Sequence, residues 1–383
     1  METVNRSRTS ASPRMEIDTK TWAPKLARNV LRNTLGLKKG ETLTIEAWPL
    51  ALPWLDAFLI EARKMGVLPM VLYESESAYW TNIEQGRAES LGKLGAQEWA
   101  ALKESNAYVF FWGPADRTRW HKLSDATMKT LTAHEEEWFK VMKDRGLRMC
   151  RLELARATEE LAQEYGISYS GWVKELLEAS TLDPKQMVLD GRKISAMFES
   201  GRKVLVTHPN GTKLELHLKG RKPYVDDGII DEADVKSGFG ESTVPSGVVM
   251  VAVDEEFAEG KFKANRPTRF GPSMGMADQG SWDFKNGRLV KFKYTKGEKE
   301  FNRIYVKAGP ERDRIGTLTI GLNPKIRDSP LFEDQERGVV TIYIGGNEWL
   351  GGANKGEFKT WLVLRGADVT VDGEPLLKAG KIV

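Results

Sequence analysis

The first 153 residues alternate between segments with helical spacing of apolar residues and short, continuous apolar runs. Apolar residues that recur every three to four positions predict helices, and short runs rich in β-branched and aromatic residues predict buried strands. Helices are predicted at 22–36, 50–66, 88–104 and 135–146, and strands at 41–48, 67–74, 107–113 and 147–154. This alternation is typical of a mostly parallel sheet covered by helices. Pro69 predicts an edge position for the second strand, because proline has no N–H to donate.

The pattern changes in the second part of the chain. Residues 154–200 keep a helical spacing, with breaks at 168–172 and 181–186, and are interpreted as a helical connection. After Gly201 a hairpin is predicted at 203–220, and β runs follow at 247–253, 288–295, 317–322, 339–345, 359–366 and 367–373. The fold class is therefore α/β, with an N-terminal mostly parallel α/β domain and a C-terminal β-rich domain. The predicted division is a disordered tail (1–19), the α/β domain (20–153), the connection (154–200) and the β-rich domain (201–383).

Composition is that of an ordinary globular chain. Of its 383 residues 40% are hydrophobic and 29% are charged, and the formal net charge is +3, so nucleic acid is not demanded as a partner. The single cysteine, Cys150, excludes an intrachain disulfide, is predicted to be a buried structural thiol, and fits a cytoplasmic protein. No apolar run approaches the ~20 residues of a membrane span. The tail has no secretory pattern, but its Ser, Thr and Arg leave contact with nucleic acid open.

The four histidines, His121, His134, His208 and His217, do not form a metal-binding pattern. A turn centred on Asn210-Gly211 would pair position 208 with 213 and position 204 with 217. Both hairpin histidines would then share one face, but about 13 Å apart, too far for one ion. All four are predicted to be ordinary surface residues.

Two polar segments are candidates for chemistry. Glu333, Asp334 and Glu336 precede a predicted strand, where carboxylates either bind a cation, act as a general base or are simply solvated. The glycine-rich segment 345–356 offers backbone N–H groups to an anion or forms a plain turn. No nucleotide-binding glycine motif, paired-cysteine spacing, H-E-x-x-H or G-x-S-x-G motif is present.

The order of several segments resembles the thermophilic-type leucyl aminopeptidase family, which includes aminopeptidases T and S. The segments are "GTKLELHLKGRKPYVDDG", "TVPSGVVMVAV", "RIGTLTIGLNP" and "LFEDQERGVVTIYIGG", within a similarity that covers about residues 20–383. The resemblance implies an aminopeptidase-T-like fold, a catalytic C-terminal domain and a homodimer. It also implies two divalent metal ions that activate a water for attack on the N-terminal peptide bond.

The family's metal ligands are replaced when its motifs are laid on this chain. The five positions hold Val248, Thr317, Thr341, Thr360 and Leu362. Only the acidic group persists, and the family's catalytic glutamate corresponds to Glu336 or Asp334, with the spacing to Thr341 favouring Glu336. Valine and leucine ligate nothing, and neutral threonine is a poor partner for a divalent ion. No metal cofactor is therefore expected.

Three functions remain open on these grounds. The leading hypothesis is a non-peptidase relative, a pseudoenzyme that binds a protein, a peptide or a small molecule through the old cleft or the dimer surface. The second is an enzyme of different chemistry with Glu336 or Asp334 as general base, together with Glu348 and Trp349 on the facing turn. It predicts an enclosed pocket in which a carboxylate has a raised pKa. The third is a residual metallo-aminopeptidase with ligands elsewhere.

Overall fold

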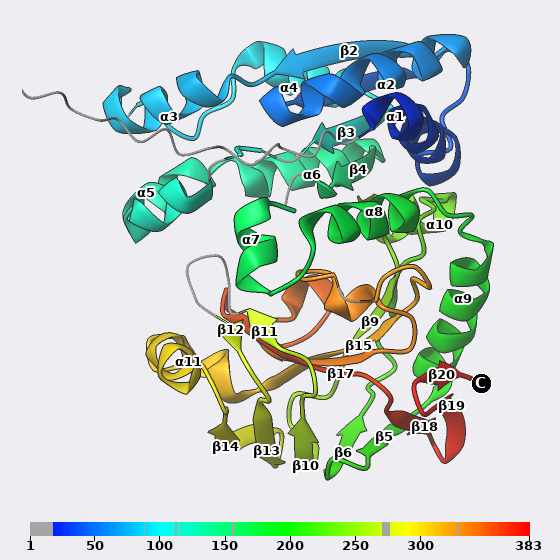
Figure 1. The fold of residues 1–383 in the computed structure, drawn as a ribbon, viewed down its shortest axis with the longest axis vertical. Helices are drawn as coiled ribbons and strands as arrows, with labels where there is room; N and C mark the ends of the chain where they lie inside the picture. Colours follow the sequence, from blue (N-terminus) through cyan, green and yellow to red (C-terminus); the bar gives the residue numbers. More distant parts are fainter. Residues whose placement is uncertain are drawn as a thin grey trace, which may run out of the picture.

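The first half of the chain forms a five-stranded parallel sheet. A computed structural model describes residues 18–383 except 88, 112, 116, 155–156, 270–275 and 328. The strand order is β2-β1-β3-β4-β8, all parallel. The bounds are β1 (Thr42–Ala47), β2 (Leu68–Tyr73), β3 (Ala107–Phe111), β4 (Arg148–Leu152) and β8 (Glu241–Val244). The four predicted strands and their parallel arrangement are confirmed, and β2 with Pro69 lies at the edge (Figure 1).

Helices cover both faces of this sheet because successive strand residues point to opposite sides. On β3, Val109 packs with Phe58 of α2, whereas Tyr108 packs with Leu102 of α4 and Met142 of α6. The helices are α1 (Thr19–Arg28, continued by a π-helical turn at Asn29–Thr34), α2 (Leu52–Lys64), α3 (Glu76–Gln85), α4 (Ala96–Glu104), α5 (Asp125–Leu131) and α6 (Glu135–Arg145). The helix predicted at 88–104 begins only at 96, where the Glu98 carboxylate accepts the backbone N–H of Gly95.

Cys150 lies on β4 and is fully buried, as predicted for a structural thiol. Burial raises the pKa of its thiol well above the ordinary value, and the charge of Asp226 adds to the shift. The thiol is therefore protonated at neutral pH and is no nucleophile.

Three helices connect the two halves of the chain: α7 (Glu159–Glu164), α8 (Tyr169–Ser180) and α9 (Lys185–Ser200). In Figure 1, α7 and α8 lie between the two halves and α9 runs along the side of the second half. The first break falls at 165–168 and not at 168–172. The reason is local, because the Ser168 hydroxyl accepts the backbone N–H of Gly171 and so begins α8. The face of α8 that carries Trp172 and Leu176 packs into the core of the first half.

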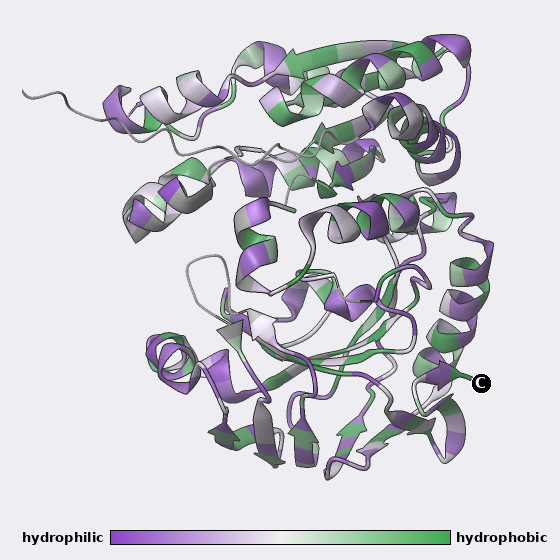
Figure 2. Ribbon diagram, in the orientation of Figure 1, coloured by the Kyte–Doolittle hydropathy of each residue, from purple (hydrophilic) through white to green (hydrophobic). Residues whose placement is uncertain are grey.

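The rest of the chain forms two antiparallel sheets packed face to face. One has the order β14-β13-β10-β6-β5-β18-β19-β20, and the other, called here the β7–β17 sheet, has the order β17-β16-β15-β9-β7. The residues on their inner faces are almost entirely apolar and share one core with α9 and α11. Hydrophobic residues are coloured green along these strands in Figure 2. The strands of the first sheet are β5 (Lys203–His208), β6 (Thr212–His217), β10 (Ala258–Lys263), β13 (Ser281–Lys285), β14 (Arg288–Lys293), β18 (Asp368–Val371), β19 (Glu374–Lys378) and β20 (Lys381–Ile382). Those of the second are β7 (Tyr224–Asp226), β9 (Val248–Ala252), β15 (Ile315–Gly321), β16 (Val340–Gly345) and β17 (Lys359–Leu364); the remaining elements are β11 (Thr268–Arg269), β12 (Met276–Ala277), α10 (Glu232–Ser237) and α11 (Glu298–Tyr305).

The hairpin of β5 and β6 differs from its predicted register by one residue. His208 pairs with Thr212 and Lys203 with His217, so the loop has three residues, 209–211, instead of two. Because the side-chain period of a strand is two, this slip places His208 and His217 on opposite faces of the sheet. The prediction that they share a face was wrong.

Strand β8 connects the two halves of the molecule. It comes from the β-rich part of the sequence but pairs with β4 of the parallel sheet. Asp226 of β7 accepts hydrogen bonds from the Ser242 hydroxyl (2.6 Å) and the Thr243 backbone N–H (3.2 Å), so it ties the edge of one sheet to the edge of the other. The division of the chain at 153 and 200 stays a prediction.

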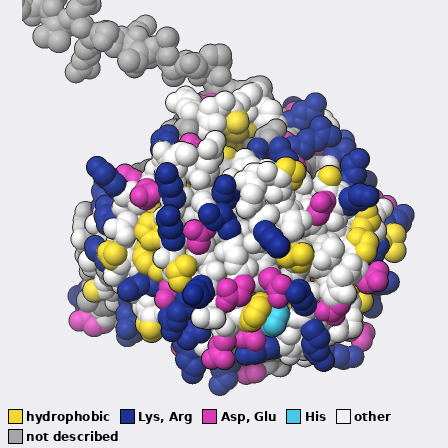
Figure 3. All heavy atoms as spheres, turned by 90° about the horizontal axis from the view of Figure 1, so that it is seen from below, with side chains coloured by type: hydrophobic (Ala, Val, Ile, Leu, Met, Phe, Trp, Pro, Cys, Tyr) yellow, Lys and Arg dark blue, Asp and Glu magenta, His cyan; other side chains and the backbone are white. Residues whose placement is uncertain are grey.

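The surface shows no single-sign field on the side drawn in Figure 3, where basic side chains are interspersed with acidic ones. Pairs such as Lys261–Asp283, at 3.1 Å, and Lys219–Asp254, at 2.8 Å, account for part of this mixture. Residues 1–17, for which disorder and nucleic-acid contact were considered, lie outside the described residues. Within the described residues, no helix combines the length and the apolar character needed to cross a bilayer.

Candidate functional site

One face of the β7–β17 sheet collects most of the residues on which the predictions rest. We call it the site face and define it by Met250, Thr317, Thr319, Thr341 and Tyr343. The register places Thr319 between Met250 and Thr341, and Thr317 beside Tyr343. Cross-strand partners point to the same side of a sheet, so these side chains form two adjacent rows. The opposite face belongs to the core between the two antiparallel sheets.

The structure brings together only part of the predicted ligand set. Thr317 and Thr341 are diagonal neighbours on the site face. Val248 lies on the same face but pairs with Gly321, four residues and about 13 Å along β15 from Thr317.

Thr360 and Leu362 of β17, the other two predicted positions, lie on the opposite face of the sheet. They pair with Ile344 and Ile342 on the core face, so neither points toward Thr341. The β17 residues that share the site face are Lys359, Trp361 and Val363. The rings of Trp361 and Tyr343 are tilted against each other with centroids 5.6 Å apart.

Three threonine hydroxyls in this sheet are buried without a hydrogen-bond partner: Thr319 and Thr341 on the site face, and Thr360 in the core. A buried hydroxyl left unpaired costs on the order of 1–3 kcal/mol. The hydroxyls of Thr319 and Thr341 stand on directly paired residues, and orphaned polar groups of this kind require an explanation in a native structure.

The residues present do not fit a dinuclear metal centre. Such a centre needs several carboxylate and imidazole ligands to offset two adjacent dications. The site face offers neutral hydroxyl, thioether and phenol groups instead. Among the described residues, no group of three or more His, Cys, Asp and Glu side chains is placed to hold a metal ion. We therefore derive no metal-dependent step.

The acidic segment 333–336 is held against the end of β15 by backbone contacts. The Asn323 backbone N–H donates to the carbonyl of Gln335 (2.8 Å), and the Arg337 N–H donates back to the carbonyl of Asn323 (3.1 Å). The fully buried Asn323 amide also donates to the carbonyls of Ser246 (2.7 Å) and Ala179 of α8 (3.2 Å). The segment is thus anchored at the junction of the two halves.

Gly321 permits this close approach. A Cβ atom there would collide with the carbonyl oxygen of Glu336, which belongs to the backbone and has no room to move. Gly321→Ala is expected to lower the free energy of unfolding by about 1–3 kcal/mol, as overpacking does. Urea denaturation would measure it, with Gly171→Ala as the control, because the nearest atom to a Cβ at Gly171 in α8 lies 3.5 Å away. An equal response of the two variants would contradict this role for Gly321.

The catalytic candidates Glu336 and Asp334 are both engaged with neighbouring side chains. The Arg365 guanidinium donates to Glu336, with Nε 3.0 Å from Oε2. The Tyr343 hydroxyl donates to Asp334 Oδ2 at 2.9 Å, which places Asp334 over the site face. Burial, with the Asp334 charge, holds the pKa of Tyr343 well above its ordinary value. Glu336 therefore has a structural partner, and Asp334 is the carboxylate that reaches the site face.

Glu333 has the raised pKa that the second hypothesis required. Its side chain is buried in the 3₁₀ turn Glu333–Gln335, where burial and then the charge of Asp334 raise its pKa to about 7, against backbone hydrogen bonds and Arg266. A carboxyl group that titrates near neutrality can take and return a proton. The sequence predicted such a group, but at Glu336 or Asp334.

The turn Glu348–Leu350 lies beside strands β7 and β17, at the two edges of the β7–β17 sheet. The ring of Trp349 lies 5.7 Å from that of Tyr224 on β7, and the Lys359 ammonium on β17 lies 5.5 Å from Trp349. Leu350 packs in one cluster with Tyr224 and Ala252. Trp349 and Glu348 are both exposed. That this turn faces the acidic segment stays a prediction.

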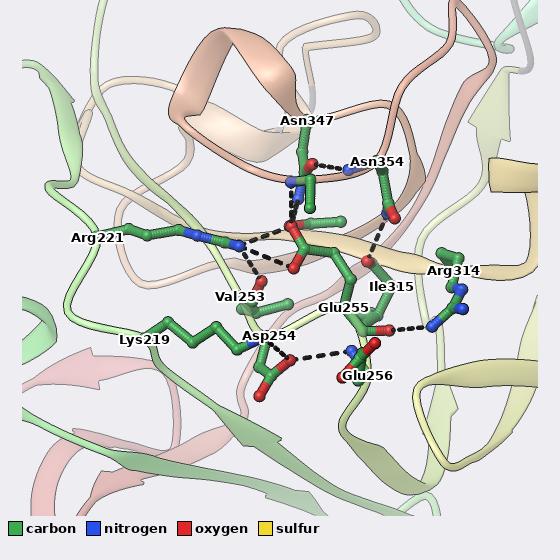
Figure 4. A network of polar contacts seen from close by, with 12 residues as sticks. Lys219, Arg221, Val253, Asp254, Glu255, Glu256, Arg314, Ile315, Asn347 and Asn354 are labelled. Carbon is green, nitrogen blue, oxygen red and sulfur yellow. Dashed lines mark hydrogen bonds and ion pairs between the residues drawn. The ribbon is translucent and has the colours of Figure 1, made fainter.

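A buried polar network holds this turn and was missed by the sequence analysis (Figure 4). Glu255 receives a bidentate pair from Arg221 (2.7 and 2.8 Å), the Ala353 backbone N–H (2.7 Å) and the Asn347 amide (2.9 Å). The Asn354 backbone N–H donates to the Asn347 side chain at 3.0 Å. These N–H groups of segment 345–356 are used internally, which favours the turn over the anion-binding alternative. No local pattern marks Glu255, because its partners lie 34 to 98 residues away.

The sequence matches one protein family, and the fold is similar to those of two proteins of known structure. Residues 20–332 match the profile of the family described as thermophilic metalloprotease (M29). The fold is similar to that of wild-type AmpT from Thermus thermophilus, with a TM-score of 0.68 and 18% identity over 95% of this chain and 99% of that chain. It is also similar to 2,5-dihydroxypyridine dioxygenase from Pseudomonas putida KT2440, with a TM-score of 0.63 and 14% identity over 96% and 98%. No curated protein matches the sequence.

Proposed function

The chain belongs to the thermophilic metalloprotease (M29) family, and on that premise we propose that it is a non-peptidase member that binds a peptide or small molecule over the site face. The observation that carries the proposal is the composition of that face. The family resemblance implies metal ligands at five positions. Three of them, Val248, Thr317 and Thr341, lie on the site face, and the other two, Thr360 and Leu362, lie on the opposite face of the sheet.

The surroundings of the site face support binding. Trp349, Trp361 and Tyr343 provide aromatic surface, and aromatic groups contribute much of the contact energy in binding sites. Lys359 adds a cation; protein atoms around its ammonium lower its pKa by desolvation, although part of the side chain remains exposed. A ligand with apolar groups and a carbonyl or carboxylate acceptor would match this arrangement. The homodimer implied by the family resemblance stays a prediction.

A metal and hydrolysis assay tests the proposal. The purified protein is incubated separately with zinc, cobalt and manganese, dialysed, and analysed for bound metal and for release of N-terminal residues from a peptide panel. The expected result is less than one retained ion per chain and no hydrolysis above that of the metal salt alone. Metal-dependent hydrolysis that is lost in Asp334→Asn and kept in Glu300→Gln, an exposed carboxylate on α11, would overturn it.

The alternative is an enzyme with different chemistry at the same place, and the pKa of Glu333 favours it specifically. Glu333 would exchange a proton with a bound substrate, while Tyr343, hydrogen-bonded to Asp334, would orient it. The similarity in fold to a protein named as a dioxygenase shows that this architecture is not restricted to peptide hydrolysis. A metal-independent turnover lost in Glu333→Gln would decide for this alternative.

A further inference from the structure

A cavity lies beside α11, lined by none of the residues that define the site face. It is open to the surface, has a volume of about 460 Å³, and is lined by Ile304, Lys307, Ala308, Gly309, Glu311, Glu357 and Phe358. Helix α11 is found at the left of Figure 1, and Phe358 directly precedes β17. A volume of this size is in the range of small-molecule sites.

One carboxylate on the wall of this cavity has no partner within the described residues. Glu311 lies in the 3₁₀ turn Pro310–Asp313, and the residue as a whole is only 7% exposed. Its carboxylate oxygens take part in no hydrogen bond or ion pair among the described residues. Neither oxygen is fully enclosed by protein, so both face the open cavity, where a cationic ligand can reach them.

The backbone leaves room for this carboxylate on two sides. A Cβ atom at Gly309 would collide with Oε2 of Glu311, and a Cβ atom at Gly356 would collide with Oε1. Gly356 also has a φ of +148°, a conformation that L side chains rarely adopt. Two glycines from segments 47 residues apart in the chain therefore lie against the two oxygens of one carboxylate.

The rest of the cavity selects the kind of cation. Ile304, Ala308 and Phe358 form an apolar wall, and Tyr305 supports Phe358 from behind with ring centroids 6.4 Å apart. Calcium and magnesium take several oxygen ligands, and the cavity offers two carboxylates at most. An organic ammonium group matches one carboxylate, and its hydrocarbon part matches the apolar wall.

We propose that this cavity binds a small organic amine, with its ammonium group on Glu311 and its apolar body against Ile304 and Phe358. Lys307 at the rim would repel a second cationic group and would accept an acidic substituent at the far end of the ligand. The proposal does not depend on the function of the site face, because the two places share none of the residues named for either.

Calorimetric titration with 2-phenylethylamine tests the proposal, with 2-phenylethanol as the neutral analogue of similar shape. For a ligand of this size a dissociation constant on the order of 1–10 mM is expected for the amine. A charge-assisted hydrogen bond contributes about 1.5–3 kcal/mol, so Glu311→Gln should weaken amine binding about 10- to 100-fold. Binding of the alcohol should be weaker than that of the amine by a similar factor.

Two controls separate site loss from unfolding. Glu357→Gln removes the rim carboxylate of the same cavity and should change amine affinity less than about threefold, as expected of an exposed charge. Ile304→Ala should weaken the amine and the alcohol equally, because it removes apolar contact only. Unchanged amine binding in Glu311→Gln, equal affinity for amine and alcohol, or no amine binding at about ten times the expected constant would each overturn the proposal. Circular dichroism checks that the Glu311→Gln variant is folded. If that variant does not fold, weaker binding of the amine to Ile304→Ala still tests whether the amine binds in this cavity.

Discussion

Replacing Glu255 by alanine is expected to lower the free energy of unfolding by about 3–5 kcal/mol, the cost of breaking a buried ion pair from one side. The substitution removes the carboxylate that accepts from the Arg221 guanidinium, the Asn347 amide and the Ala353 N–H. The Arg221 guanidinium then keeps one backbone acceptor, the carbonyl of Val253, and no counter-charge. Burial alone would raise the pKa of Glu255, but the hydrogen bonds from Arg221, Ala353 and Asn347 outweigh it, so the pKa lies below its ordinary value. Urea denaturation followed by tryptophan fluorescence measures the loss, and Trp349 on the affected turn should report it.

The matched control is Glu178→Ala, which breaks the exposed pair with Lys174 at 3.9 Å. Exposed pairs contribute about 0–1 kcal/mol. A double variant, Arg221→Met with Glu255→Leu, should lose less than Glu255→Ala does, because it leaves no uncompensated charge. If Glu255→Ala costs no more than Glu178→Ala, the network does not hold the Trp349 turn.

Glu333→Gln is expected to stabilise the protein above pH 7 by up to about 3 kcal/mol and to leave it unchanged below pH 4. The pKa of Glu333 is raised from 4.5 to about 7 in the folded protein, mainly by burial. The folded state therefore binds the proton more tightly than the unfolded state, so stability falls as pH rises from 4.5 to 7. Each pH unit in this window corresponds to about 1.4 kcal/mol. Glutamine resembles the protonated form and removes the loss.

The measurement is the difference in free energy of unfolding between the variant and the parent at pH 4, 6 and 8. Taking a difference cancels the contributions of Asp226 and Glu46, whose pKa values burial raises to about 7 and about 6. Glu300→Gln, at an exposed position of α11, should show no such pH dependence. A flat difference across this range would show that the pKa of Glu333 is the same in the folded and the unfolded protein and would remove the main support for the alternative enzymatic function.

The spacing of hydrophobic residues was sufficient to predict most strands and helices of the first half and the β-rich character of the second half. The four strand and helix alternations of the first half, the edge position of the Pro69 strand and the β-rich second half are all present. Hydrophobic spacing predicts these because each element must bury one face or both. The resemblance added the family and the fold, which the comparisons confirm.

The pairing register of the strands could not be predicted from the spacing of hydrophobic residues. The hairpin slipped by one residue because its loop takes in Pro209 as well as Asn210-Gly211, and this moved one histidine to the other face. The same rule separates Thr341 from Thr360. Each was aligned by motif, but the face on which a strand residue points depends on pairing with distant strands.

The sequence by itself determined the fold class, the family and the acidic segment 333–336 as a candidate. It also led to the prediction that the ligand positions implied by the family resemblance lack carboxylates and imidazoles. Only the tertiary structure decided which of those positions share a face, that burial raises the pKa of Glu333 to about 7, and that Glu255 and Glu311 are buried. The reason is that burial and charge neighbours are set by residues far apart in the chain, and a pKa or an enclosed cavity exists only once the chain has brought them together.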